Sequence, residues 1–250
     1  MPVFNIKYYQ KRPFEKISKK SNGYILESFN KVINLIKINK IQGFINCPIS
    51  KKHLLGSKHQ GITELLAKRF NVSGNEVMLI FNKKLSVSPI TTHIPLNKVS
   101  NQINKKNIVR KINIIDKFYK RKLKIKPNIG VLGLNPHNYS GMKNSEEKKF
   151  IVPALKALKK MGIKVVGPIS PDTSFVIHKK YKLNAIVGMY HDQVLTPYKS
   201  LFGYDAINVT LGLPFFRTSP DHGIAEDIIC QNKASPESLI QAIKFFNYLK

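Results

Sequence analysis

Three histidines of this chain come directly after short apolar runs, where an imidazole could bind a metal ion. His93 lies in TTHIP, His137 in GLNPHN and His191 in MYHDQ. In α/β sheets, ligands bind beyond the carboxyl ends of strands, so the three side chains are candidates for one site. Three neutral imidazoles suit a catalytic divalent metal that keeps an open position. The alternative hypothesis is three separately hydrogen-bonded structural histidines.

Two cations and an amide are candidates for anion recognition. Lys199 follows MYHDQ, and Asn208 and Arg217 lie in INVTLGLPFFRTS, another strand-like run. Neither Lys199 nor Arg217 has an acidic neighbour in its own segment, so each either is solvated or binds an anion. The planar fork of Arg217 is well suited to a phosphate or carboxylate.

Several common signatures are absent from the sequence. It contains no GxGxxG or GxxxxGK[ST] nucleotide loop and no GxSxG elbow. Cys47 and Cys230 have no metal-type pairing and no nearby histidine, which favours a reducing, cytoplasmic setting. No apolar stretch approaches the roughly 18 residues of a membrane span. The basic N-terminus lacks the apolar core of a signal peptide.

The chain is strongly basic, with 42 Lys and Arg residues against 14 Asp and Glu and a formal net charge of +28. Such a charge could indicate a nucleic-acid-binding protein. The lysines are spread along nearly every segment, however, whereas nucleic-acid proteins more often concentrate charge among stacking aromatics. We therefore expect no specific nucleic-acid partner, but a general attraction for anions that includes phosphorylated small molecules.

Helical and strand patterns alternate along the chain and predict an α/β fold with a mainly parallel sheet. Apolar residues recur at helical spacing in 25–36, 62–70, 108–118 and 239–249, with Ser235 before Pro236 as a helix start. Strand-like runs cover 43–48, 78–82, 86–93, 128–135, 164–168, 185–190 and 207–214. A capping-box pattern of Asn144 and Glu147 predicts a helix through Leu158, with a kink at Pro153. No repeat, linker or boundary divides residues 1–250.

Four motifs carry a resemblance to a known family: GLNPH (133–137), GPISPDTSF (167–175), MYHDQ (189–193) and NVTLGLPFFRTSPDHG (208–223). In this order they closely resemble the 4-hydroxythreonine-4-phosphate dehydrogenases of pyridoxal phosphate biosynthesis, the PdxA family. The likeness runs from about residue 21 to the C-terminus. The family has the two-lobed fold of isocitrate and isopropylmalate dehydrogenases, which binds a dinucleotide without a GxGxxG loop. Residues 1–250 are then a single catalytic region with two lobes.

The resemblance also implies roles for individual residues. The family's metal ligands correspond to His93, His137 and His191. Its substrate-binding positions correspond to Thr63, Lys199, Asn208 and Arg217. Acidic residues of its active-site region correspond to Asp172 and Asp192, which are candidates for catalysis. The segment DHG, with His222 and Gly223, resembles the loop that borders the adenosine of the cofactor.

The implied reaction oxidises the secondary alcohol of 4-phosphooxy-L-threonine with NAD⁺. The resulting β-keto acid loses CO₂ and gives 3-amino-2-oxopropyl phosphate. A divalent metal assists as a Lewis acid; a histidine set suits Zn²⁺ or Co²⁺, and Mg²⁺ binds less tightly. The family completes its active site across a homodimer interface, so we expect a cytoplasmic homodimer with no membrane partner.

The sequence departs from the family at several places. GITE replaces the family's GHTE, so Ile62 stands where a substrate-binding histidine is usual. The loop after His137 is slightly shortened and lacks the usual acidic, glycine-rich pattern. The chain begins several dozen residues late, and we expect the first strand–helix units of the fold to be missing. These departures leave a second hypothesis, a non-catalytic relative that binds metal and phosphate without turnover.

Overall fold

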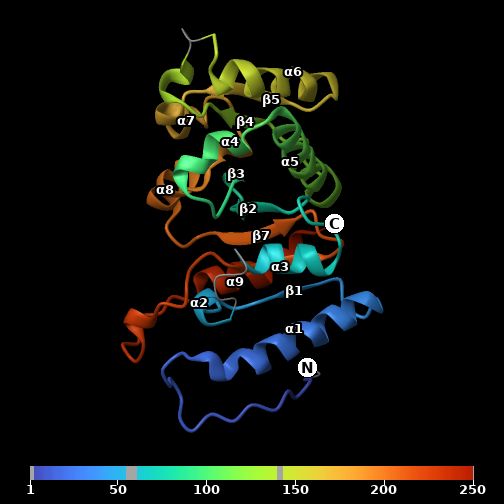
Figure 1. The fold of residues 1–250 in the computed structure, drawn as a ribbon, viewed down its shortest axis with the longest axis vertical. Helices are drawn as coiled ribbons and strands as arrows, with labels where there is room; N and C mark the ends of the chain where they lie inside the picture. Colours follow the sequence, from blue (N-terminus) through green and yellow to red (C-terminus); the bar gives the residue numbers. More distant parts are fainter. Residues whose placement is uncertain (1–2, 55–60, 140–142, 250) are drawn as a thin grey trace.

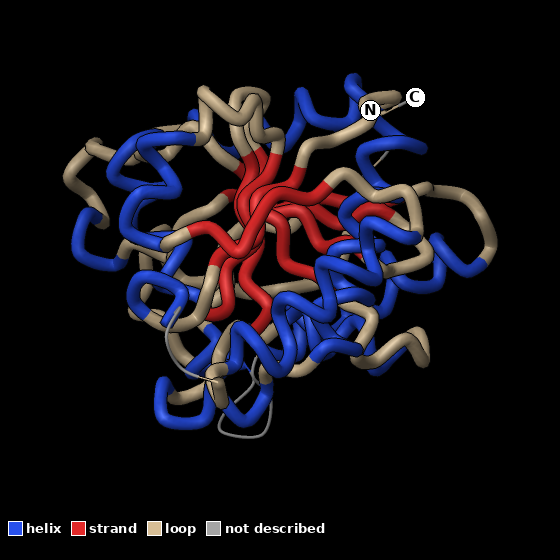
Figure 2. Tube along the Cα trace, turned by 90° about the horizontal axis from the view of Figure 1, so that it is seen from above, coloured by secondary structure: helices blue, strands red, loops and turns tan. Residues whose placement is uncertain are grey.

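A computed structural model describes residues 3–54, 61–139 and 143–249 of the chain (Figure 1). One mixed sheet of eight strands runs through the described residues in the order β1-β8-β7-β2-β3-β6-β4-β5. Figure 2 shows the strands as a twisted stack in the middle of the molecule, with helices on both sides. The strands are β1 (Gly43–Ile45), β2 (Val77–Phe81), β3 (Ser86–Thr91), β4 (Ile129–Leu132), β5 (Val165–Ile169), β6 (Ala185–Tyr190), β7 (Ile207–Leu211) and β8 (Phe216–Pro220).

The strand pairing confirms the predicted α/β class with mainly parallel strands. β3 pairs in parallel with β6, β6 with β4, and β4 with β5, and β1 pairs in parallel with β8. The central pairs β3–β2, β2–β7 and β7–β8 are antiparallel. Because β3, β6 and β4 are parallel neighbours, their carboxyl ends meet at one edge of the sheet, where the three histidine segments begin.

The helices lie where apolar residues recur at helical spacing. They are α1 (Asn22–Lys37), α2 (Lys51–Leu54), α3 (Ile62–Arg69), α4 (Val99–Gln102), α5 (Lys105–Phe118), α6 (Val152–Lys160), α7 (Pro171–Ile177), α8 (His191–Phe202) and α9 (Glu237–Phe245). The Asn104 side chain caps α5 by accepting a hydrogen bond from the Asn107 backbone at 2.9 Å. Ser235 similarly accepts from the Glu237 backbone before α9.

Three apolar clusters hold the helices to the sheet. One face carries α5, α6 and α9, with buried residues such as Ile112, Leu158 and Phe245. The opposite face carries α8, whose Tyr198 is fully buried. At the β1 end of the sheet, α1 and α3 pack around Phe215. Alternate residues of one strand enter different clusters, as the two-residue period of a strand requires.

The predicted capping box is wrong. Asn144 and Glu147 do not open a regular helix, because a π-helical turn covers Glu147–Ile151 and the α-helix begins only at Val152, with Pro153 in its first turn. A proline is tolerated there because it interrupts no intrahelical bond. The Glu147 carboxylate instead bonds the backbone of a distant loop.

Two further features follow from the described residues. No helix among them has the length and apolar character needed to cross a bilayer. Cys47 and Cys230 are both free and exposed.

Candidate active site

A polar cleft of about 330 Å³ opens over β2, β7 and β8 and reaches the ends of β3 and β6. Alternate residues of the antiparallel strands point into it, because residues directly opposite each other in such pairs share a face. Eight residues singled out from the sequence line the cleft: Thr63, His93, His191, Lys199, Asn208, Arg217, His222 and Gly223. The structure therefore brings together segments that lie up to 160 positions apart.

His93 and His191 lie side by side, just beyond the carboxyl ends of the parallel strands β3 and β6. Their ring centroids are 5.9 Å apart. His191 Nδ1 is 2.6 Å from Asp192 Oδ1, and His93 Nδ1 is 3.6 Å from Glu64 Oε1. Each ring therefore turns Nδ1 toward a carboxylate, so Nε2 is the nitrogen that remains for another partner.

Burial and the contact with His93 shift the pKa of the Glu64 carboxyl in opposite directions. Burial raises the pKa of its carboxyl, but the contact with His93 and the charges of His93 and Lys51 outweigh it and lower the pKa overall. Glu64 is therefore ionised at neutral pH and holds the His93 ring. Its second oxygen, Oε2, is buried without a hydrogen-bond partner among the described residues.

His137 does not line this cleft. It lies in the short helical turn Pro136–Tyr139 after β4, with a left-handed φ of 50°, and Asn138 and Tyr139 are also left-handed. The charge of His137 acts on Asp172 at the start of α7. Across 3–54, 61–139 and 143–249, no group of three or more His, Cys, Asp or Glu side chains is arranged to hold a metal.

The loop that carries His137 is fixed by Glu147. This side chain is buried, and its Oε1 accepts hydrogen bonds from the backbone of Leu134 at 2.9 Å and of Asn135 at 2.8 Å. Burial raises the pKa of Glu147, but the hydrogen bonds from Asn135 and Leu134 outweigh it and lower the pKa. Asn138 adds a bond to the Pro168 carbonyl at 3.1 Å. The left-handed turn is thus held by surrounding contacts rather than by its own sequence.

Arg217 is the buried cation of the cleft. It is 4% exposed, and its Nε and Nη1 donate to Asn46 Oδ1 at 2.7 Å and Thr210 Oγ1 at 3.1 Å. Both partners are neutral. Burial lowers the pKa of Arg217 to about 10 against the opposing charge of Glu64, so the guanidinium stays charged at neutral pH. A buried charge held by neutral groups is well prepared to bind an anion.

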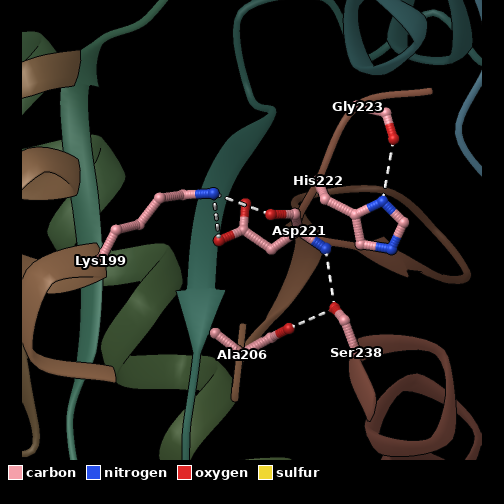
Figure 3. A network of polar contacts seen from close by, with 6 residues as sticks. All are labelled: Lys199, Ala206, Asp221, His222, Gly223 and Ser238. Atoms are coloured by element: carbon pink, nitrogen blue, oxygen red, sulfur yellow. Dashed lines mark hydrogen bonds and ion pairs between the residues drawn. The ribbon is translucent and has the colours of Figure 1, made fainter. Parts of the chain in front are cut away.

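Lys199 differs from Arg217 because it already has an anionic partner. Its Nζ donates to the Asp221 carbonyl at 2.8 Å and lies 3.2 Å from Asp221 Oδ2, an ion pair without good hydrogen-bond geometry (Figure 3). Burial raises the pKa of Asp221, and the Lys199 ammonium opposes that shift. Ser238 fixes Asp221 by accepting from its backbone at 2.9 Å while donating to the Ala206 carbonyl at 2.6 Å.

The two aspartates predicted to be catalytic lie outside the cleft lining. Asp172 is fully exposed, and its pKa is lowered mainly by the hydrogen bond from Ser170 at 2.7 Å. The Asp192 side chain is 78% exposed and contacts the far side of the His191 ring. Asp192 is placed to orient His191, and Asp172 lies within the electrostatic influence of His137.

Thr63, Asn208 and Ile62 occupy the cleft in different ways. Thr63 Oγ1 lies 3.4 Å from Thr210 Oγ1, and Asn208 Oδ1 is buried with no hydrogen-bond partner in the described part of the chain. Ile62 is 6% exposed and packs in the apolar cluster of Phe215. The isoleucine therefore serves the core as well as the cleft wall.

Charged cleft residues that the sequence patterns missed include Glu64, Glu76, Lys111 and Asp221. Lys111 lies three residues after Ile108 and four before Ile115, on the buried side of α5, and this spacing was an available signal. Glu76 directly precedes β2 and has no such pattern.

The donor set fits a metal only in part. Each of the two cleft histidines has a carboxylate on Nδ1, which is the usual outer support of a metal-bound imidazole. Two nitrogens do not complete a site, so these two histidines alone do not make a metal centre.

Comparisons with known proteins show the family of this chain. The family described as "Pyridoxal phosphate biosynthetic protein PdxA" matches residues 1–246. A 4-hydroxythreonine-4-phosphate dehydrogenase of Sulfurihydrogenibium sp. (strain YO3AOP1) is 45% identical over 217 residues, 84% of this chain and 66% of that protein. A D-threonate 4-phosphate dehydrogenase of Pectobacterium atrosepticum is 39% identical over 217 residues, 86% of this chain and 66% of that protein. The chain thus spans 66% of the length of both relatives.

Solved structures match over most of the chain. The crystal structure of 4-hydroxythreonine-4-phosphate dehydrogenase from Klebsiella pneumoniae has a TM-score of 0.79 at 33% identity, covering 93% of this chain and 72% of that one. Isocitrate dehydrogenase from Methylococcus capsulatus has a TM-score of 0.56 at 12% identity, covering 90% and 73%. These matches confirm the predicted isocitrate dehydrogenase-like α/β fold.

Proposed function

The chain belongs to the PdxA family, and from this membership we propose that it is an NAD-dependent 4-hydroxythreonine-4-phosphate dehydrogenase. The reaction is the oxidation and decarboxylation of 4-phosphooxy-L-threonine to 3-amino-2-oxopropyl phosphate, in pyridoxal phosphate biosynthesis. One observation carries the proposal: a single cleft places the buried Arg217 beside His93 and His191, each with a carboxylate on Nδ1.

The cations of the cleft bind the phosphate end of the substrate. Arg217 offers a fixed guanidinium whose two hydrogen-bond acceptors, Asn46 and Thr210, are neutral, so its charge is available to an anion. Lys199 must exchange its contact with Asp221 for the phosphate. The raised pKa of Asp221 eases this exchange, because a carboxyl that loses its partner in a buried place takes up a proton more readily. Asn208 and Thr63 complete the contact set.

The histidines hold a divalent cation, Zn²⁺, Co²⁺ or Mg²⁺. When bound there, the ion supplies Lewis-acid polarisation of the alcohol oxygen and of the later keto group. Asp192 and Glu64 act behind His191 and His93, where they fix the rings with Nε2 toward the cleft.

The third histidine comes from a second copy of the chain. His137 lies on the same sheet edge as the other two but outside their cleft, in a turn that Glu147 and Asn138 hold rigidly. A homodimer that places His137 of the partner subunit over the cleft would complete the ligand set and bring Asp172 with it. Asp172 then adds negative charge near the metal and a possible proton acceptor.

The cofactor lies at the rim formed by His222 and Gly223. His222 Nδ1 lies 2.9 Å from the Gly223 carbonyl oxygen, at hydrogen-bond distance (Figure 3). The His222 ring meets the Tyr204 ring edge-on, with the ring centroids 6.3 Å apart. Gly223 has no heavy atom within 4 Å of the position a Cβ would occupy, so this rim is open to a flat ring system. NAD⁺, when bound at this rim, would supply the hydride acceptor for the reaction.

Product analysis tests this function. With 4-phosphooxy-L-threonine, NAD⁺ and a divalent metal, we expect NADH and CO₂ in a one-to-one ratio and 3-amino-2-oxopropyl phosphate by mass spectrometry. If the protein binds metal and phosphate but forms no NADH, the non-catalytic hypothesis raised by Ile62 is correct.

A further inference from the structure

Two oppositely charged residues of the cleft have no role in the reaction described above. Glu76 directly precedes β2, and Lys111 lies in the middle of α5; both line the cleft with Arg217. The two elements are neighbours in the fold, because α5 packs against β2.

Both residues keep unused hydrogen-bonding capacity. Glu76 Oε2 is buried and accepts no hydrogen bond from the described residues. Lys111 Nζ donates to the Ile90 carbonyl at 2.9 Å, which uses one of the three donors of an ammonium. Within the described ranges, no ion pair joins Lys111 to a carboxylate.

The two charges nevertheless act on each other. Burial lowers the pKa of Lys111, and the charges of Glu76 and Glu64 oppose that shift while Arg110 adds to it. Glu76 and Lys111 thus line one cleft with opposite charges, and no ion pair joins them in the part of the chain that the structure describes. A ligand that presents a positive and a negative group side by side would satisfy both at once.

We propose that Glu76 and Lys111 form a recognition site for a zwitterionic α-amino-carboxylate. Glu76 accepts hydrogen bonds from the ligand's ammonium, and Lys111 donates to its carboxylate. The proposal rests on the proposed function, since Arg217 and Lys199 are then left for the phosphate end of the same molecule. It adds the two residues that would select the α-amino-acid end of that substrate over the corresponding hydroxy acid.

Other atoms in the cleft favour the same class. Glu64 Oε2 and Asn208 Oδ1 are further buried acceptors without donors among the described residues. An ammonium brings three donors and a positive charge, whereas a hydroxyl brings one donor and no charge. A hydroxy acid would leave the Glu76 carboxylate uncompensated in a partly desolvated place. The distinction matters because relatives of this chain include both a 4-hydroxythreonine-4-phosphate dehydrogenase and a D-threonate 4-phosphate dehydrogenase.

Calorimetric titration with two ligands tests the site. The ligands are 4-phosphooxy-L-threonine and the threonate 4-phosphate of the same configuration, in which a hydroxyl replaces the ammonium. We expect the wild-type protein to bind the amino compound at least about 10-fold more tightly, the effect of one charge-assisted contact. Glu76→Gln should reduce the ratio to about 3-fold or less. Glu27→Gln, an exposed change of the same kind, should leave it unaltered.

The lysine gives a second, independent test. Lys111→Met should weaken both ligands by about 10-fold or more without changing their ratio, because both carry the carboxylate. Lys117→Met, exposed on the same helix, is the matched control. Melting curves verify that each variant is folded. If a variant does not fold, the ratio of the two ligand affinities measured with the wild-type protein still tests the site.

Turnover separates this inference from the proposed function. Equal affinity and equal NADH formation with both ligands would overturn the zwitterion site and leave the proposed reaction standing. A 10-fold binding preference that Glu76→Gln removes, without NADH from either ligand, would support the site and overturn the reaction. Failure of the wild-type protein to bind either ligand would overturn both.

Discussion

Arg217→Lys keeps the positive charge in the cleft but removes the planar fork. In the free protein, the guanidinium bonds Asn46 Oδ1 at 2.7 Å and Thr210 Oγ1 at 3.1 Å. A lysine ammonium at the end of a flexible stem cannot hold both acceptors and face a phosphate at the same time. We therefore expect the variant to lose one contact within the protein and one contact with the substrate.

Each lost charge-assisted hydrogen bond costs about 1.5–3 kcal/mol. Loss of the contact within the protein lowers the free energy of unfolding by that amount, which corresponds to a Tm decrease of about 3–12 °C for a chain of this size. Loss of the contact with the substrate lowers kcat/KM about 10- to 100-fold. The burial of Arg217, at 4% exposure, places both effects near the upper end of their ranges.

The assay combines thermal melting with steady-state NADH formation and substrate titration calorimetry. Arg121→Lys, at an exposed position, is the control and should change neither Tm nor kcat/KM. A normal substrate Kd and kcat/KM for a folded Arg217→Lys would refute the assignment of the guanidinium to the phosphate. A lower Tm with normal kinetics would show that Arg217 serves only the fold.

Three further changes test other parts of the site. Glu147→Gln should lower the free energy of unfolding at neutral pH by about 1–3 kcal/mol, measured by denaturant titration, because it weakens the bonds to the loop of His137. Folding lowers the pKa of Glu147 from its ordinary value of 4.5, so the ionised carboxylate stabilises the protein above pH 4.5 and this stabilisation is lost as the pH falls further. If the free energies of unfolding of the two proteins differ by the same amount at every pH, the assignment is wrong. Ile62→His should lower the free energy of unfolding by about 1–3 kcal/mol, because it places a polar ring in an apolar cluster. The same change should raise kcat/KM, because it restores the histidine that the family uses to contact the substrate. An unchanged melting curve would show that the new side chain does not enter the cluster. His191→Ala should weaken metal binding about 10-fold or more by chelator competition, whereas His178→Ala should not, and equal metal affinity in both variants would rule out the His191 assignment.

The fold was largely predictable from the sequence because its elements follow simple periodicities. The runs at 185–190 and 207–214 became β6 and β7, and the pattern at 108–118 became most of α5. The mixed order of the sheet was not predictable, since strand neighbours such as β3 and β6 are set by packing over nearly 100 residues. The capping-box prediction failed because Glu147 gains more from the backbone of Leu134 and Asn135 than from capping its own helix.

The candidate site was predictable where chemistry follows a strand end. His93 and His191 meet because β3 and β6 are parallel neighbours that end together at Thr91 and Tyr190. His137 lies elsewhere because its turn is left-handed and is bonded to the Pro168 carbonyl of β5, which no local pattern reveals.

The charged residues Glu76 and Lys111 escaped notice for a different reason. Glu76 directly precedes strand β2, and Lys111 lies in α5, whose sequence has the pattern of an ordinary amphipathic helix. Their importance arises only from facing one cleft, and that information belongs to the tertiary structure.

Metal-dependent NADH formation tests the central claim most directly. The protein is stripped with a chelator and assayed by NADH absorbance with NAD⁺ and 4-phosphooxy-L-threonine, before and after a divalent metal is restored. Our account predicts no NADH from the stripped protein, NADH after restoration, and none when the substrate is omitted or when His191→Ala replaces the wild type. NADH formation that is unaffected by the chelator and by His191→Ala would contradict the account.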